Sequence, residues 1–328
     1  METLVIEIPK GSYLPVFRPR EPEHDHIEIV GVIPPAPPRS KLRRITLGVV
    51  STIAAAAILI WAAAFTARNL ARRTARPTVE AFWNQLFRNG QPTYLVLSDV
   101  NLIDFEMLVG GSVSLSEYEA HEFDRLSELK IGDPVKRAFA REFVNRVTTA
   151  VSDVQVARDF GVLASDLRLP LTIISARDMS SSLVSSMNTI LLGSWRANPW
   201  VGLLEDQLTF RTDYQESPPS VRFVNRSPLA GEQAAYQAEW RRIGYCRIAF
   251  LSNPRRTGNV LLISGSDVIS TEAGGRFIAS EDWIVQLRQK LGLKAGRPLP
   301  HFELLLRTQI VNSTVPRFEM VAYRPHGT

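Results

Sequence analysis

Four polar segments follow apolar runs of strand length, and they carry the side chains best suited to bind a ligand. In open α/β sheets, ligands bind beyond the carboxyl ends of the strands, close to helix N-termini. Small residues there let backbone N–H groups approach a ligand, and an arginine such as Arg196 can clamp a carboxylate or phosphate. The predicted ligand-binding residues are Ser98, Asp99, Asp178, Ser194, Arg196, Asn198, Trp200, Ser264, Ser266, Thr271 and Glu272.

The same residues have simpler interpretations. Asp178, Asn198 and Asp267 all stand where a helix N-cap is expected. Asp99 and Asp178 follow neighbouring apolar runs, so they could instead form a carboxylate pair for acid–base chemistry. Ligand site, helix caps and carboxylate pair all remain open at the level of the sequence.

The motifs of the common nucleotide-binding and hydrolytic sites do not occur in this sequence. There is no GxGxxG, GxxxxGK[ST], GxSxG or HExxH pattern. The single cysteine, Cys246, lies in an apolar run, so it is expected to be buried and inert and offers no cysteine zinc site. We therefore predict no cofactor, no metal site and no catalytic residue.

Short apolar runs alternate with helical patterns through the larger part of the chain. Thr93–Leu97, Leu171–Ile174 and Thr189–Leu192 are continuous apolar strands, as in a sheet covered on both faces. Residues 302–311 and 318–323 indicate a hairpin. The predicted fold class is α/β: a mostly parallel sheet with helices on both faces, a Rossmann-like three-layer sandwich, with an antiparallel C-terminal hairpin and one preceding transmembrane helix.

One helix of this domain has an apolar stripe near the 3.6-residue period. Asp133 precedes Pro134, a pairing typical of a helix start. The stripe predicts one long helix with a buried face made of Val135, Phe139, Phe143, Val147, Val151 and Val154.

Residues 45–67 carry no charge and predict a transmembrane helix. At about 1.5 Å per residue they would span roughly 34 Å, against about 30 Å for a bilayer core. Basic residues flank both ends, and Trp61 and Phe65 stand near one of them. These features predict a single-pass protein of the cell (inner) membrane, with the lipid bilayer as a partner, the N-terminus cytoplasmic and the large domain outside.

Proline and charge divide the rest of the chain. We predict a Pro-rich disordered tail at 1–44, the transmembrane helix at 45–67, a basic stalk at 68–92 and the α/β domain at 93–328. The net charge of +5 comes from arginines next to the apolar segment, where it suits lipid headgroups. We therefore expect no direct contact with nucleic acid.

Residues 188–211 and 259–277 carry an N-PW…L-FR block and a small-residue block before Phe277. In both, the chain resembles a family of uncharacterised bacterial single-pass membrane proteins with a C-terminal α/β domain. Some members look like winged-helix regulators, but the 44 residues before the apolar segment here are too few and too Pro-rich for such a domain. The resemblance implies a sensing context and transfers no functional residue.

Together these features predict a membrane-anchored, non-catalytic domain that senses a small molecule or binds a partner protein. An envelope hydrolase or transferase that uses Asp99 or a serine is the first alternative. A structural assembly protein is the second.

Overall fold

The computed structural model describes residues 4–7, 16–19, 54–66, 76–216, 219–294, 296–309 and 317–326. The chain divides into two compact units, Met1–Ala64 and Phe65–Thr328. In the first unit, β1 (Leu4–Glu7) pairs antiparallel with β2 (Val16–Pro19). These two strands lie within the tail predicted to be disordered.

The prediction of a transmembrane helix is corrected by the structure. Of the predicted segment, residues 54–66 are described, and they are helical. Across the described ranges, no helix is long and apolar enough to cross a membrane. Residues 45–53 and Ala67 lie outside those ranges.

A mixed seven-stranded sheet organises the described part of the second unit, in the order β12-β11-β9-β10-β5-β3-β4. The pairs β3–β4, β3–β5 and β5–β10 are parallel, whereas β9–β10, β9–β11 and β11–β12 are antiparallel. The strands are β3 (Thr93–Leu97), β4 (Leu171–Ser175), β5 (Asn188–Leu192), β9 (Ile243–Ser252), β10 (Asn259–Gly265), β11 (Phe302–Gln309) and β12 (Arg317–Pro325).

The predicted mostly parallel, Rossmann-like sheet is therefore wrong: half of the sheet is antiparallel. A second sheet, with the order β6-β7-β8, is antiparallel throughout. Its strands are β6 (Phe210–Glu216), β7 (Pro219–Asn225) and β8 (Ala235–Gln237). The error arises at β9, an apolar strand buried almost along its length. A strand that is buried on both faces of a sheet is a continuous apolar run whether it lies parallel or antiparallel to its neighbours. The composition of the run therefore does not show the direction of the strand.

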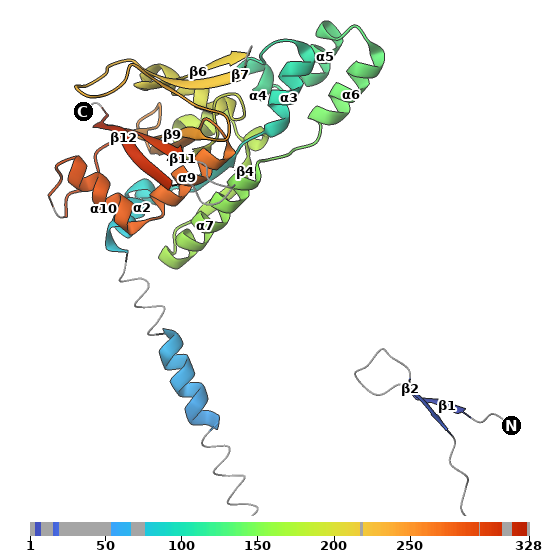
Figure 1. Cartoon of the computed structure of the whole chain (residues 1–328), viewed down its shortest axis with the longest axis vertical. Helices are drawn as coiled ribbons and strands as arrows, with labels where there is room; N and C mark the ends of the chain where they lie inside the picture. The colour runs from blue at the N-terminus through green and yellow to red at the C-terminus, as the bar shows by residue number, and fades with distance from the viewer. Residues whose placement is uncertain are drawn as a thin grey trace, which may run out of the picture. The chain divides into compact units, whose positions relative to one another are not determined.

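One face of the large sheet is covered by α2 (Pro77–Leu86), α7 (Val151–Leu167), α9 (Val268–Ile278) and α10 (Glu281–Lys290). The helices α2 and α10 come from opposite ends of the domain sequence and pack together (Figure 1). Trp83 of α2 is fully buried and meets Phe160 of α7 edge-on, at 4.9 Å between ring centroids. The folded core thus reaches into the segment predicted to be a stalk.

The opposite face is covered in two parts. Over β3, β5 and β10 lie α3 (Val100–Val109), α4 (Leu115–Glu119), α5 (Phe123–Lys130), α6 (Pro134–Val144) and α8 (Ser181–Ser186), which share a second core. Over β9, β11 and β12 the three-stranded sheet replaces helices, through a small core that includes Phe210, Phe223 and Leu305. Short 3-10 turns complete the domain: η1 (Arg88–Gly90), η2 (Ala176–Asp178), η3 (Pro199–Leu203) and η4 (Glu205–Gln207).

The apolar stripe predicted for one long helix is divided between two helices and faces outward. Residues 145–150 separate α6 from α7. Val135 is 78% exposed and Phe139 56%. The face of α7 that packs on the sheet carries Val156, Phe160 and Leu163 instead. Both helices are amphipathic, but the sequence pattern alone did not identify which apolar stripe meets the sheet.

Candidate functional site

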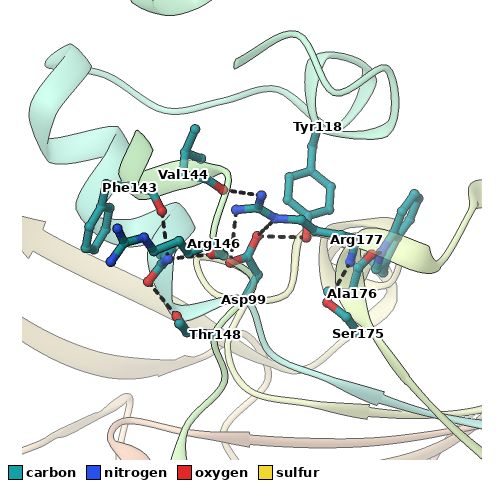
Figure 2. A network of polar contacts seen from close by, with 11 residues as sticks. Asp99, Tyr118, Phe143, Val144, Arg146, Thr148, Ser175, Ala176 and Arg177 are labelled. Atoms are coloured by element: carbon teal, nitrogen blue, oxygen red, sulfur yellow. Dashed lines mark hydrogen bonds and ion pairs between the residues drawn. The ribbon is translucent and has the colours of Figure 1, made fainter. Parts of the chain in front are cut away.

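The carboxyl ends of β3 and β4 meet in a buried network of polar contacts (Figure 2). The carboxylate of Asp99 accepts hydrogen bonds from Arg177 Nε at 2.6 Å and from the Tyr118 hydroxyl at 3.2 Å. Arg177 Nη1 also donates to the carbonyl of Val144. The Asp99 side chain is 0% exposed and that of Arg177 7%. The charges are therefore paired with each other and shielded from solvent.

Tyr118 is held neutral inside this network. Burial, together with the adjacent charge of Asp99, raises the pKa of its phenol far above the ordinary value. The Arg177 guanidinium also lies over the ring of Phe123, at 4.9 Å from its centroid. The network ties α3, α4, α5 and the end of β4 together, which is a structural role. In this arrangement the Asp99 carboxylate is not exposed to solvent, so a substrate could not contact it.

Three further predicted residues tie the strand ends together. Ser98 donates its backbone N–H and its hydroxyl to the Asp153 carboxylate of α7, at 2.9 and 2.6 Å. The Asn198 amide donates to the carbonyl of Leu192 at 3.0 Å. Trp200 is fully buried, and its indole N–H donates to the carbonyl of Ala176 at 2.7 Å. These side chains are brought together but point into the protein.

The predicted residues after β10 form the start of α9. Asp267 caps that helix by accepting from the backbone N–H of Ser270 at 2.9 Å. Ser266 donates its hydroxyl to the same carboxylate at 2.9 Å, and Thr271 donates to the Asp267 carbonyl at 3.2 Å. Ser264 is buried at the strand end, while Glu272 pairs with Arg276 one turn on, at 2.6 Å.

The other three predicted residues lie apart from these groups. Asp178 is exposed on η2. The backbone carbonyl of Ser194 accepts hydrogen bonds from the backbone N–H groups of Ala197 and Asn198 in the turn after β5. Arg196 leaves that turn toward the small sheet, where its guanidinium lies 4.0 Å from the Tyr214 ring centroid and 3.7 Å from the Glu106 carboxylate.

A cleft of about 830 Å³ opens beside Arg196, where the helical cover meets the small sheet. The helical side contributes Glu106 of α3, Leu115 of α4 and Trp195 of the turn after β5. The small sheet contributes residues 211–214 of β6 and Val224 of β7. The cleft therefore combines apolar side chains with charged side chains of both signs, including Asp206 and Arg226, and four consecutive residues of one strand line it.

Glu205, which lines the cleft, is held in place by a buried ion pair. Arg247 of β9 is 0% exposed and donates to both carboxylate oxygens of Glu205, at 3.1 and 2.6 Å. The same guanidinium donates to the Phe210 carbonyl at 2.7 Å. From β11, buried Glu303 accepts the backbone N–H groups of Thr209 and Phe210, at 2.8 and 2.7 Å. These contacts anchor the start of β6 on the large sheet.

The free edge of β6 faces the cleft. Within the described sheet β6 pairs with β7 alone. The Phe210 N–H and C=O bond to Glu303 and Arg247, so they point away from β7. Backbone direction alternates along a strand, and the N–H and C=O groups of Thr212 and Tyr214 therefore also point away from β7. Thr212 is only 8% exposed, and its hydroxyl has no partner among the described residues.

Arg177 and the strand β6 along the cleft are not among the residues that the sequence predicts for a site. Asp178, the predicted residue after β4, is exposed, whereas its neighbour Arg177 is buried and bonds to Asp99. The alternating polar pattern of residues 209–214 is typical of a half-exposed strand. It contained no information about which edge of that strand would be left unpaired.

No group of three or more His, Cys, Asp or Glu side chains is placed to hold a metal ion in the part of the chain that the structure describes. Comparison with known proteins adds no assignment. The chain matches no protein-family model, and it shows no significant similarity to a curated protein or to a solved structure.

Proposed function

We propose that the second unit is a non-catalytic protein-interaction domain, which binds an extended segment of a partner protein along the free edge of β6. The observation that carries this proposal is the run of four consecutive β6 residues, 211–214, along the cleft. Side chains of one strand face alternately to its two sides, so a continuous run indicates that the strand edge itself borders the cleft.

Backbone pairing at this edge would supply the binding energy. An added strand accepts and donates the hydrogen bonds that Thr212 and Tyr214 leave open, at about 0.5–1.5 kcal/mol each. The walls formed by Leu115, Trp195 and Val224 favour a segment with apolar side chains at alternate positions.

A small-molecule ligand is the second candidate, since 830 Å³ lies in the usual range for such sites, about 300–1,000 Å³. The two candidates differ in what they need from β6. A peptide strand requires the edge N–H of Tyr214, whereas a small molecule in the same cleft depends mainly on the side chains of the walls.

The test is selection of binding peptides from a displayed library by the full chain, followed by titration of the selected peptide against variants. Tyr214→Pro removes the edge N–H and the ring, while Tyr214→Ala removes only the ring. We expect Tyr214→Pro to weaken binding at least about tenfold more than Tyr214→Ala does. Trp195→Ala should weaken binding, whereas Trp240→Ala, at an 84% exposed position outside the cleft lining, should not.

Equal affinity of the two Tyr214 variants would refute strand addition. A small molecule whose affinity falls with Trp195→Ala and is the same for both Tyr214 variants would replace the proposal with the second candidate.

A further inference from the structure

The two edges of the large sheet are protected very differently. Edge strand β12 carries Arg317, Glu319 and Arg324 and ends in Pro325, which are features that prevent pairing with another strand. Edge strand β4, with the sequence LTIIS, has no charged residue and no proline. Among the described strands, β4 pairs with β3 alone. One edge is thus blocked, and the other is a suitable surface for strand pairing.

An apolar groove of about 610 Å³ runs beside the β4 edge, between that strand and α7. Its lining includes Leu97 and Ile173 on the sheet and Val154 and Val162 on the helix. Ile173 is 47% exposed, Val154 52% and Val162 59%. The exposure arises because α7 packs over β3 and β4 with Phe160 and Leu163 and leaves its neighbouring stripe uncovered.

We infer that this groove and the β4 edge form a two-fold interface between two copies of this chain. A two-fold axis perpendicular to the sheet, through the β4 edge at Ile173, pairs β4 antiparallel with β4 of the second copy. The two sheets become one continuous sheet, and the same axis brings the two α7 helices antiparallel on one face. Val162 and Ile173 line the same groove, so one axis serves both elements.

The charges on α7 are arranged for a partner that is identical and antiparallel. Arg158 and Asp166 both line the groove, and they stand four residues before and after Val162. Arg158 also pairs with Asp159 of its own helix, at 2.7 Å and at an exposed position. An axis near Val162 therefore places Arg158 of each copy opposite Asp166 of the other. The open space beside Gly161 between them allows the helices to approach closely. An unrelated partner would not need this symmetry, whereas an isologous contact requires it.

The inference predicts a concentration-dependent dimer of the full chain in sedimentation equilibrium. Val162→Lys, which puts a charge at the axis, should weaken the dimer at least about a hundredfold in Kd, because two lysines then meet. Val268→Lys is the matched control at a 54% exposed valine outside the groove, and it should leave the Kd unchanged.

Charge exchange provides the sharper test. Arg158→Asp alone or Asp166→Arg alone creates two like-charge contacts and should raise the Kd about tenfold. The double exchange, Arg158→Asp with Asp166→Arg, restores both opposite-charge pairs and should return the Kd to within about threefold of the parent chain. A monomer at concentrations up to about 100 μM would overturn the inference. So would a dimer that Val162→Lys leaves intact, or single exchanges whose effects add in the double variant.

Discussion

Replacing Arg177 with methionine is expected to destabilise the domain by about 3–5 kcal/mol, which is the typical cost of removing one partner from a buried ion pair. Asp99 would keep its charge at a position with 0% exposure and would lose its hydrogen bonds from Arg177 at 2.6 and 3.3 Å. The Tyr118 hydroxyl, at 3.2 Å, would be its remaining side-chain donor. Methionine fills much of the arginine volume, so the cost reflects mainly the uncompensated charge.

The Asp99–Arg177 pair is best tested as a double-mutant cycle. Asp99→Asn removes the other charge and should also cost several kcal/mol, because the buried Arg177 charge then has only neutral acceptors, the amide oxygen of the new side chain and the Val144 carbonyl. The double variant leaves no unpaired charge. Its destabilisation should therefore be at least about 2 kcal/mol smaller than the sum of the two single effects.

The cycle is measured by urea unfolding of the full chain, followed by tryptophan fluorescence and far-ultraviolet circular dichroism. A common m-value across the variants shows that the same surface unfolds in each. A loss below about 1 kcal/mol for Arg177→Met, or simple additivity in the double variant, would refute the conclusion that the two charges depend on each other.

Two further predictions concern the turn after β5 and the pH dependence of stability. Gly193 has a φ of +95°, and an added Cβ would lie 3.1 Å from the Ser98 Cβ, so Gly193→Ala should cost about 1–3 kcal/mol in the same unfolding assay; an unchanged midpoint would refute this. Burial, with nearby His326, lowers the pKa of His301 from its ordinary 6.5. The unfolded chain then binds a proton at higher pH than the folded chain, so this contribution to stability is complete above pH 6.5 and is lost as the pH falls. His301→Gln should flatten the fall in melting temperature between about pH 6.5 and 5, and an unaltered slope would contradict the assignment.

Local patterns located several elements correctly. The apolar runs at 93–97, 171–174 and 189–192 correspond to β3, β4 and β5 within one residue at either end. Asp133 caps α6 as its place before Pro134 predicts, by accepting the backbone N–H groups of Val135 and Lys136. These features depend on a few neighbouring residues, so a single sequence contains the information for them.

For the candidate site residues too, the sequence predicts position along the chain but not the contacts of the side chain. Polar residues at strand ends could be located from the sequence because they follow apolar runs, and the structure does place Ser98, Asp99, Asn198 and Trp200 at one end of the sheet. Whether each side chain points into the protein or toward solvent depends on partners distant in sequence. Asp99 meets Arg177, 78 residues away, and no local pattern predicts that bond.

The sequence by itself therefore determined the positions of the strands β3, β4 and β5, the cap of α6 and the burial of Cys246. The tertiary structure alone decided the antiparallel direction of β9, the cover of β9 and β11 by a second sheet, and the cleft at its margin. It also decided that the apolar stripe of α6 faces outward. The physical reason is that hydrophobic periodicity indicates only which side chains are buried. Long-range contacts decide the direction of a strand, which of its edges stays unpaired and which face of a helix packs on the sheet.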